Sequence, residues 1–433
     1  MKVTMIGTGY VGLVSGACFA DFGIEVTCCD VDETKIATLS AGGVPFYEPG
    51  LAEKIVQNVA AGRLDFTTDV GAAIRGADVV FIAVGTPARD DGSTDLTYID
   101  SVADEIGRHL NGYKVIATKS TVPPRTGDRI RRRIRAQAGD DAEFDVASNP
   151  EFLREGSAVE DFMRPNRIVI GVDSKRAAEM MQALYRPLYL IETPIVVTSM
   201  PTAEMIKYAS NAFLAVKITF INEVANMCER MGADVHVVAR SMGLDGRISS
   251  KFLHAGPGFG GSCFPKDVSA LVATAEEVDY DFMLGRAALA ANARQHELMV
   301  DKIRTAVGDL DGVSVGLLGL AFKPNTDDTR ASPAIAIAEG LLAGGARIQA
   351  FDPAAMDNAR GVLGDRVVYC DNEYAACNGV DVAVIATEWN QFRNLDLVRL
   401  RAGMRAPVVV DLRNVYEPAR MGELEFQYTS VGR

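Results

Sequence analysis

The chain is poor in the residues that most often build metal sites and disulfide frameworks. It has only four histidines, and none belongs to a metal-binding motif such as HExxH. Its seven cysteines are an odd number and show neither disulfide-like nor zinc-like spacing. We therefore expect no catalytic metal and a reducing compartment, the cytoplasm.

Long apolar runs are also missing, since no stretch of about 18 consecutive apolar residues occurs, and this argues against a membrane span. The N-terminal MKVTMIGTGY has a single lysine and an apolar run broken by glycines, which predicts a first strand rather than a signal peptide. A net charge of −13 disfavours nucleic acid or another polyanion as the general partner. An anionic substrate would need a local cluster of basic side chains and backbone N–H groups.

What the chain does have is length and an alternating pattern at both ends. Its 433 residues are too many for one hydrophobic core and predict two or three domains. In the N-terminal part, strands are expected at Lys2–Ile6, Glu25–Cys29, Val79–Val84, Val115–Thr118 and Ile168–Gly171. In the C-terminal part, strands are expected at Val313–Leu318, Arg347–Phe351, Val382–Ala386 and Val408–Asp411. Strands that alternate with helices predict parallel, doubly wound sheets.

The middle of the chain follows a different pattern. Residues Thr202–Met231 contain no Gly or Pro and carry apolar groups on nearly every face, which predicts a long, largely buried helix. Such a helix suits a spine between two domains or a subunit interface. We therefore expect an α/β protein with two Rossmann-like domains, residues 1–200 and 311–433, joined through a helical domain of residues 201–310.

A glycine-rich motif follows the first predicted strand. Gly7-Thr8-Gly9-Tyr10-Val11-Gly12 matches GxGxxG, opens a helix, and is followed by Asp30 at the end of the second strand. The glycines would serve a tight turn, the approach of a pyrophosphate and close helix–strand packing, with the phosphates at the positive end of the helix. Asp30 would accept hydrogen bonds from the adenosine ribose and repel a 2′-phosphate, which favours NAD over NADP. Lys35, one turn further on, weakens that preference slightly.

The second α/β region lacks this motif. Its Gly316-Leu317-Leu318-Gly319 is not a complete GxGxxG, so this domain need not bind a dinucleotide. It could instead bind a nucleotide through Lys323, Arg330 and Arg413.

A second glycine-rich segment, Gly258-Phe259-Gly260-Gly261-Ser262-Cys263, runs into Phe264-Pro265-Lys266-Asp267. Glycines before the cysteine would let a ligand approach the backbone. Pro265 opens a helical stretch, so Cys263 lies near a helix N-terminus with Lys266 close by, and both features favour a thiolate. Cys263 is therefore the candidate nucleophile, with Asp267 able to orient a water or an amine. A small buried residue in a turn is the alternative.

Polar groups also interrupt apolar segments. Lys207 and Asn211 lie four residues apart on the predicted central helix and share one face. They could stabilise an oxyanion beside Cys263, or they could form a buried salt bridge and a helix–helix hydrogen bond. Glu151 and Glu155, after a predicted strand, could handle protons or simply favour a helix N-terminus.

These pieces occur together in one family. The chain resembles the UDP-glucose/GDP-mannose 6-dehydrogenases from end to end. The motifs that carry the resemblance are GTGYVGL (7–13), EPGL (48–51), VGTP (84–87), STVPP (120–124), NPEFLREGSA (149–158), EMIKYASNAFLAVKITFINE (204–223), GFGGSCFPKD (258–267) and GLAFKPNTDDTRASPA (319–334). The KFL segment at 251–253 and Phe264 look like the UDP-glucose branch rather than the GDP-mannose branch.

The resemblance implies a fold, a reaction and a set of site residues. It implies an NAD-binding domain at 1–200, a dimerisation domain with the cysteine loop at 201–310, a UDP-sugar-binding domain at 311–433, and a homodimer. UDP-glucose would be oxidised by four electrons to UDP-glucuronate through a thiohemiacetal and a thioester on Cys263. The implied catalytic residues are Cys263, Lys207, Asn211, Asp267, Thr121 and Glu151. The implied NAD contacts are Gly7, Gly9, Tyr10, Val11, Gly12, Asp30, Lys35, Thr86, Thr121, Glu155, Lys266 and Arg330. The implied substrate contacts are Glu151, Phe152, Leu153, Arg154, Lys207, Asn211, Phe252, Leu253, Gly260, Lys323 and, lent to the neighbouring subunit, Arg247.

Other functions remain open at this point. A GDP-mannose 6-dehydrogenase would share all these motifs. A two-electron 3-hydroxyacid-type dehydrogenase would share the domain order and the central Lys and Asn but would have no use for Cys263. A catalytically silent nucleotide-sugar binding protein would have no need of Cys263, Lys207, Asn211 and Asp267 together.

Overall fold

The computed structural model describes all 433 residues, which divide into two compact units. The first unit comprises Met1–Ser210 and Ala270–Tyr280, and the second comprises Asn211–Ser269 and Asp281–Arg433. Two helices, α9 (Met200–Met231) and α11 (Phe264–Glu276), contribute residues to both units. The three-part division at residues 200 and 310 stays a prediction.

The first unit is built on an eight-stranded sheet with the strand order β3-β2-β1-β4-β5-β6-β7-β8. The strands are β1 (Lys2–Ile6), β2 (Glu25–Cys29), β3 (Leu64–Thr67), β4 (Val79–Ile82), β5 (Lys114–Thr118), β6 (Phe144–Ser148), β7 (Ile168–Val172) and β8 (Ile195–Thr198). The helices are α1 (Tyr10–Asp21), α2 (Glu33–Ser40), α3 (Leu51–Ala60), α4 (Val70–Gly76), α5 (Thr97–His109), α6 (Thr126–Ala138), α7 (Ala158–Met163) and α8 (Lys175–Leu184), with a 3-10 turn at Arg186–Ile191.

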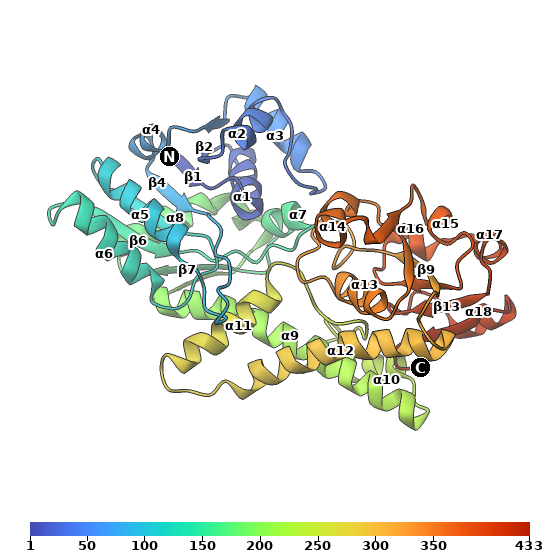
Figure 1. Ribbon diagram of the computed structural model, residues 1–433. Helices are drawn as coiled ribbons and strands as arrows, with labels where there is room; N and C mark the ends of the chain where they lie inside the picture. Colours follow the sequence, from blue (N-terminus) through green and yellow to red (C-terminus); the bar gives the residue numbers. More distant parts are fainter. The chain divides into compact units, whose positions relative to one another are not determined.

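Helices cover both faces of this sheet, and the strand sequences show why (Figure 1). Along β4, Val79 and Phe81 belong to the core beneath α1 and α7, whereas Val80 and Ile82 belong to the core beneath α4, α5 and α6. Successive side chains of a strand point to opposite faces, so a continuous apolar run such as VVFI is buried on both sides. The doubly wound expectation is confirmed for this unit.

One strand departs from the expected all-parallel arrangement. β7 runs antiparallel to β6, pairing Ser148 with Gly171. A parallel crossover needs a connection that carries the chain back along the sheet, usually on a helix. The helix in this connection, α7, has only 6 residues and so rises about 9 Å, which is shorter than the strand it would have to span.

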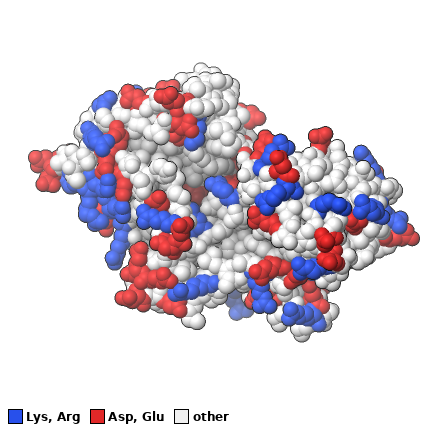
Figure 2. Space-filling view, in the orientation of Figure 1, with Lys and Arg blue, Asp and Glu red and all other residues white.

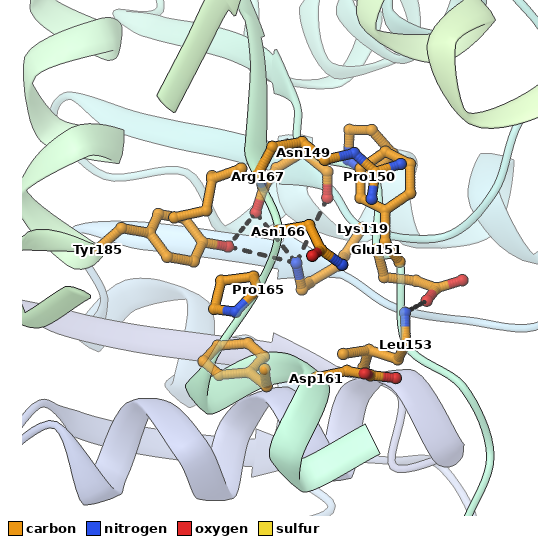
Figure 3. Close-up of a pocket in the computed structure, with 13 residues that line it drawn as sticks. Lys119, Asn149, Pro150, Glu151, Leu153, Asp161, Pro165, Asn166, Arg167 and Tyr185 are labelled. Carbon is orange, nitrogen blue, oxygen red and sulfur yellow. Dashed lines mark hydrogen bonds between the residues drawn. The ribbon is translucent and has the colours of Figure 1, made fainter. Parts of the chain in front are cut away.

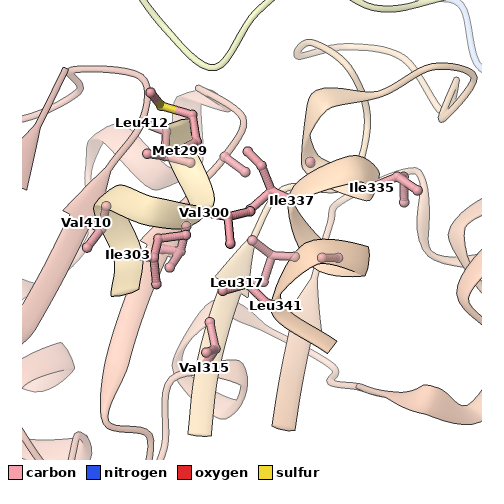
Figure 4. Packing of buried hydrophobic residues seen from close by; sticks show 14 of the residues in the cluster. Met299, Val300, Ile303, Val315, Leu317, Ile335, Ile337, Leu341, Val410 and Leu412 are labelled. Atoms are coloured by element: carbon pink, nitrogen blue, oxygen red, sulfur yellow. The ribbon is translucent and has the colours of Figure 1, made fainter. Parts of the chain in front are cut away.

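The second unit holds a six-stranded, all-parallel sheet in the order β11-β10-β9-β12-β13-β14. The strands are β9 (Ser314–Leu318), β10 (Arg347–Phe351), β11 (Val367–Tyr369), β12 (Val382–Ile385), β13 (Val408–Asp411) and β14 (Gln427–Ser430). The helices are α10 (Val235–Gly243), α12 (Met283–Val307), α13 (Pro333–Ala343), α14 (Met356–Leu363), α15 (Glu373–Ala376), α16 (Asn390–Arg393), α17 (Leu397–Gly403) and α18 (Pro418–Glu423), with a 3-10 turn at Gly364–Arg366. Figure 4 shows part of its core, where Met299, Val300 and Ile303 of α12 pack with Leu317 and Leu341.

The central helix is only partly buried, which corrects the expectation that its apolar residues are largely covered. Phe213, Phe220 and Met227 are exposed at 65%, 49% and 59%, whereas Ile221 and Ala225 are fully buried. The three exposed residues recur every seven positions and therefore lie along one side of α9. The sequence could not distinguish a helix buried within one chain from a helix with an apolar outer side.

Charges of both signs are interspersed on the molecule, as Figure 2 shows for one face. The arginine-rich helix α6 illustrates this, because Arg129 binds Asp100 and Arg133 binds Asp104 on α5. Its basic run is thus neutralised by acidic neighbours. Among the helices, none combines the length and hydropathy that crossing a membrane requires.

Candidate active site

The glycine turn between β1 and α1 has the geometry that a dinucleotide requires. Gly7 has a φ of +103°, and a Cβ there would lie 2.5 Å from the Ala83 carbonyl oxygen. A Cβ at Gly12 would lie 1.9 Å from the Gly7 carbonyl oxygen, so this glycine lets the helix pack against the turn. Around Gly9, in contrast, nothing lies within 4 Å of the Cβ position. The three glycines therefore fit the turn, the packing contact and an open approach for a pyrophosphate.

Asp30 follows β2 and faces the same turn. Its Oδ2 accepts hydrogen bonds from the Thr8 amide (2.9 Å) and the Thr8 hydroxyl (2.8 Å). Burial alone would raise the pKa of Asp30, but the hydrogen bonds from Thr8 and from the Asp32 amide outweigh it and lower the pKa. An ionised carboxylate at this position suits ribose hydroxyls. Lys35 lies closest to Asp32, 3.8 Å from Oδ2, at the start of α2.

Two loops at the carboxyl ends of neighbouring strands meet beside this turn. Thr86 follows β4, and its hydroxyl donates to the Thr121 carbonyl after β5 at 3.0 Å. Ser120 Oγ donates to the Val84 carbonyl at 2.7 Å. The structure thus joins the predicted residues Thr86 and Thr121 at the edge of the sheet where open α/β folds bind ligands.

Glu48, which the residue-level reasoning did not single out, organises the predicted residue Tyr10. The Tyr10 hydroxyl donates to Glu48, which also accepts from the Gly156 and Ala158 amides at 2.6 and 2.7 Å. Burial, then the Glu48 contact, raises the pKa of Tyr10 far above its usual range. The EPGL motif alone gave no sign of this role, because the partners of Glu48 lie 38 to 110 residues away in sequence.

Glu151 and Lys207 form a buried ion pair in the first unit. The Lys207 ammonium lies 2.8 Å from Glu151 Oε1, and the two side chains are only 5% and 4% exposed. The other carboxylate oxygen of Glu151 accepts the Leu153 amide, and the Phe152 ring lies 5.4 Å from the ammonium. This pair is the buried salt bridge that was one of the two alternatives for Lys207. The Glu151 carboxylate is also a group that can exchange a proton with a bound hydroxyl.

Behind Glu151 lies a small cavity of about 50 Å³ with a buried lysine in its wall (Figure 3). The Lys119 ammonium donates to Asn149 Oδ1 (3.1 Å) and the Tyr185 hydroxyl (3.3 Å). Burial lowers its pKa to about 8, although the Glu151 carboxylate opposes the shift. Sequence reasoning missed Lys119 because nothing in a lysine after a strand shows that three aromatic rings will surround it.

The rest of the NPEFLREG segment is partly engaged within the chain. Arg154 is 62% exposed and binds Asp161 through two nitrogens. Phe152 is covered by the Arg167 guanidinium, which stacks 3.4 Å from its ring centroid. The charge of Glu155 contributes to the raised pKa of Tyr10 and so places it near the cofactor turn.

Cys263 lies in the second unit, directly before α11. Its carbonyl accepts the Asp267 amide at 2.8 Å, so it stands at the N-terminal end of that helix, where the dipole favours a thiolate. The Ser262 hydroxyl lies 3.5 Å from its sulfur. Its side chain is partly exposed, as a nucleophile requires, whereas Cys18, Cys28, Cys29, Cys228 and Cys377 are buried.

Asp267 connects Cys263 to the central helix. It is 0% exposed, accepts from Asn211 Nδ2 at 2.6 Å, and accepts from Lys266 Nζ at 2.6 Å. The predicted pair Lys207 and Asn211 therefore binds one carboxylate each, Glu151 in the first unit and Asp267 in the second. One turn of α9 separates the two contacts.

The glycines before Cys263 leave no room for side chains, and the expected approach of a ligand to their backbone stays a prediction. A Cβ at Gly260 would lie 2.3 Å from the Ala331 carbonyl oxygen, and one at Gly261 would lie 2.7 Å from the Phe322 ring. At Gly258 the near atoms belong to Asn292 and His296. Chain atoms occupy these positions because the loop packs against α12 and the segment before α13.

Several of the remaining predicted residues of the second unit lie on segments beside the cysteine loop, where the Arg330 carbonyl accepts the Gly261 amide at 2.9 Å. Leu253 is buried at 4%, and Phe252 adopts a left-handed φ of +65° with its ring 6.3 Å from Phe264. Lys323 lies 5.5 Å over the Phe322 ring, Arg330 binds Asp328, and Arg247 is 89% exposed and binds Asp245.

The second sheet has its own strand–turn–helix unit, but the turn is occupied by the chain itself. After β9, the amides of Leu320 and Ala321 donate to Asp352 Oδ2, which also accepts from Trp389 Nε1. Arg413 holds the Ala386 and Phe322 carbonyls. The amides of this turn are thus paired with a carboxylate that follows the second strand of the sheet, as the Thr8 amide is paired with Asp30 in the first unit.

Comparison with known proteins assigns these features to one family. Three family models match in sequence: the UDP-glucose/GDP-mannose dehydrogenase family NAD binding domain at residues 1–189, the central domain at 201–294 and the UDP binding domain at 316–418. The chain belongs to the UDP-glucose/GDP-mannose dehydrogenase family.

Members of this family match the whole chain. A UDP-glucose 6-dehydrogenase of Rhizobium meliloti is 54% identical over 437 residues, covering 100% of both chains. The UDP-glucose 6-dehydrogenase TuaD of Bacillus subtilis is 48% identical and covers 100% of this chain and 93% of its own. Among solved structures, a UDP-glucose dehydrogenase from the archaeon Pyrobaculum islandicum superposes with a TM-score of 0.92 at 41% identity, covering 99% of this chain and 96% of that chain.

Proposed function

We propose that this family member is an NAD-dependent UDP-glucose 6-dehydrogenase that oxidises UDP-glucose to UDP-glucuronate. Relatives of this name align with the chain from end to end. The observation that carries the mechanism is the arrangement around Cys263. This cysteine is partly exposed and lies at a helix N-terminus, Asp267 follows one turn later, and Asn211 donates a hydrogen bond to Asp267.

The residues of the first unit would hold the cofactor. The open side of Gly9 and the N-terminus of α1 suit the pyrophosphate, and Asp30 suits the adenosine ribose. When bound, NAD supplies the hydride acceptor for each of two successive oxidations. Thr86, Thr121 and Glu155 are the further proposed contacts of this unit, and Lys266 and Arg330 are those proposed from the second unit.

The first oxidation removes the proton of the C6 hydroxyl and a hydride from C6 of the glucose and leaves an aldehyde. Glu151 and Thr121 would take the hydroxyl proton, and Lys207 would stabilise the developing oxyanion through its ammonium. The Glu151–Lys207 contact of 2.8 Å supports these neighbouring roles.

The second oxidation uses Cys263 as a covalent nucleophile. The thiolate adds to the aldehyde carbon to form a thiohemiacetal, which loses a second hydride and becomes a thioester. Water, oriented by Asp267, then releases the carboxylate and returns the cysteine to a thiol. Covalent capture keeps the aldehyde from leaving, and two NAD are reduced for each sugar.

The choice of sugar and the assembly are also part of the proposal. Phe252, Leu253, Gly260 and Lys323 are the proposed substrate contacts, with Phe152, Leu153 and Arg154 from the first unit. The apolar seam of α9 (Phe213, Phe220 and Met227) supports a homodimer built on this helix, and the 89%-exposed Arg247 is available to a neighbouring subunit. The lack of any disulfide among seven cysteines supports work in the cytoplasm.

The deciding experiment is the stoichiometry of NADH production. Purified protein is incubated with limiting UDP-glucose, GDP-mannose or UDP-galactose and excess NAD. We expect two NADH per UDP-glucose and UDP-glucuronate as the product. One NADH with release of an aldehyde would refute the covalent mechanism, faster turnover of GDP-mannose would move the chain to the other branch, and binding without NADH would indicate a silent binding protein.

A further inference from the structure

Glu204 is a buried carboxylate on the first turns of α9 that none of the proposed catalytic steps uses. Its side chain is 2% exposed. Oε2 accepts the Arg125 amide at 2.6 Å, and Oε1 accepts the Gly127 amide at 2.9 Å. Both amides belong to the N-terminus of α6, so Glu204 caps that helix from a distant element.

The segment that Glu204 holds is the loop that carries Thr121. This loop, residues 119–125, joins β5 to α6. Its first half is fixed by Ser120 on the Val84 carbonyl and by Thr86 on the Thr121 carbonyl. Its second half ends at Arg125, a non-glycine residue with a left-handed φ of +74°. Such a conformation is unfavourable and persists only where neighbouring groups hold it, as Glu204 does here.

Glu204 also ties this loop to the helix that carries Lys207. The two residues are three positions apart on α9 and so lie on adjacent turns of one side. Lys207 forms the 2.8 Å pair with Glu151. Glu204 therefore fixes Thr121's loop relative to the Glu151–Lys207 pair, and the proposed proton-transfer groups share one anchor.

The anchor depends on the charge of Glu204. Hydrogen bonds from backbone N–H groups to an ionised carboxylate are roughly twice as strong as those to a neutral acceptor, so protonation of Glu204 would weaken its hold on the Arg125 and Gly127 amides. Burial raises the pKa of Glu204 to about 7, partly offset by the Gly127 and Arg125 amides, and Asp128 on α6 raises it further. Of the neighbouring charged groups, Arg131 on α6 is paired with Asp128 and Asp173, and Lys207 on α9 is paired with Glu151.

We propose that Glu204 is a positioning residue whose negative charge locks the Thr121 loop onto α9, so that the oxidation requires Glu204 to be ionised. The inference rests on the proposed function for its kinetic consequence. This requirement for an ionised Glu204 makes the enzyme lose activity on the acidic side of neutrality, although Glu204 touches neither substrate nor cofactor.

The kinetic test compares wild type with Glu204→Gln over pH 6–9. Wild-type kcat should fall about tenfold from pH 8 to pH 6 with a midpoint near 7. Glu204→Gln should show a low, flat kcat across that range, about tenfold below wild type at pH 8, with KM values within threefold of wild type. Its Tm at pH 8 should stay within a few degrees. Asp381→Asn, which alters a carboxylate that accepts the Ser314 amide in the second unit, should leave the profile unchanged.

A second measurement does not depend on activity. Hydrogen exchange of a peptide that spans residues 120–128, corrected for the intrinsic pH dependence of exchange, should be at least tenfold slower at pH 8 than at pH 6 in wild type. In Glu204→Gln it should be fast at both. Three outcomes would each overturn the inference. These are exchange that does not change with pH in wild type, a Glu204→Gln variant whose kcat still falls toward pH 6 as in wild type, and a variant that is inactive only because it unfolds. If wild type produces no NADH at any pH, the proposed function is refuted instead. The exchange result then decides the inference about Glu204.

Discussion

The ammonium of Lys207 lies 2.8 Å from a carboxylate oxygen of Glu151, and both side chains are almost fully buried. A buried ion pair adds little net stability, but removal of one partner leaves the other charge buried without compensation. The pair is therefore costly to break and well placed for proton transfer.

This relationship predicts a non-additive double mutant. Lys207→Met should lower the free energy of unfolding by about 3–5 kcal/mol. Glu151→Gln with Lys207→Met should recover most of that loss, because no isolated charge remains. Activity should be lost in both variants. Urea unfolding and an NADH assay measure the two effects, and a double mutant as unstable as the single one would show that charge compensation is not the cause.

Cys263→Ser should stop the second oxidation while UDP-glucose still binds. A serine hydroxyl is a far weaker nucleophile at neutral pH, so kcat should fall by roughly 100-fold or more. Rapid quench should detect at most one NADH per active site, and calorimetry should show nearly unchanged UDP-glucose affinity. Cys370→Ser, a partly exposed cysteine of the second unit, is the matched control. Wild-type turnover in Cys263→Ser would eliminate the covalent route.

Asp30→Asn should weaken NAD binding selectively. Loss of a charged acceptor costs about 1.5–3 kcal/mol, so KM for NAD should rise at least about tenfold while KM for UDP-glucose changes little. Asp32→Asn tests a neighbouring carboxylate that caps α2 and should leave KM for NAD near the wild-type value. Equal effects of the two substitutions would contradict the assignment of Asp30 to the ribose.

Lys119 predicts an unusual dependence of stability on pH. Burial lowers its pKa from 10.5 to about 8, so the folded chain binds fewer protons than the unfolded chain between these values. The stability that this group contributes is complete above about pH 10.5 and is lost as the pH falls through about 8.

Lys119→Met removes the buried charge and should therefore stabilise the protein at pH 7 by on the order of 3 kcal/mol, with the gain shrinking toward pH 10. Urea unfolding at several pH values measures this difference. Lys175→Met, at a lysine whose side chain is 90% exposed, should change stability little at any pH. A constant destabilisation by Lys119→Met would mean that its hydrogen bonds outweigh the cost of burying the charge.

The exposed seam of α9 predicts a change of assembly. Phe213→Glu with Phe220→Glu places two charges on the seam and should convert a dimer into monomers in light scattering, with loss of activity if Arg247 serves the neighbouring subunit. Val398→Glu, at another exposed apolar residue (66%), should leave the assembly unchanged. A wild-type monomer would refute the dimer outright.

Much of the fold could be predicted from the chain alone, because local rules determine it. The bounds of β1, β2, β10 and β13 agree with expectation, since apolar runs between glycine and aspartate turns leave little choice. The glycine turn with Asp30 was also predictable, because the steric need for glycine at positions 7 and 12 is local to the turn.

The candidate site is a different matter, because its contacts join segments far apart in the chain. Sequence identified Lys207, Asn211, Glu151 and Asp267, but not that the Lys207 ammonium and the Asn211 amide each donate to a carboxylate 56 residues away. It missed Lys119 and the capping role of Glu204, because a polar residue in an apolar element does not reveal its partner. Nor did it show that the Cβ positions of Gly260 and Gly261 are filled by the chain itself.

The chain's local patterns alone thus predicted the two α/β sheets, the cofactor turn and Cys263 as the candidate nucleophile. These depend on backbone sterics and on the chemistry of single residues. Only the tertiary structure decided which carboxylate faces Lys207, which charge is buried at Lys119 and what anchors the Thr121 loop. Burial and pairing of charges depend on the whole packed chain, because the environment of each group is built from segments that meet only after folding.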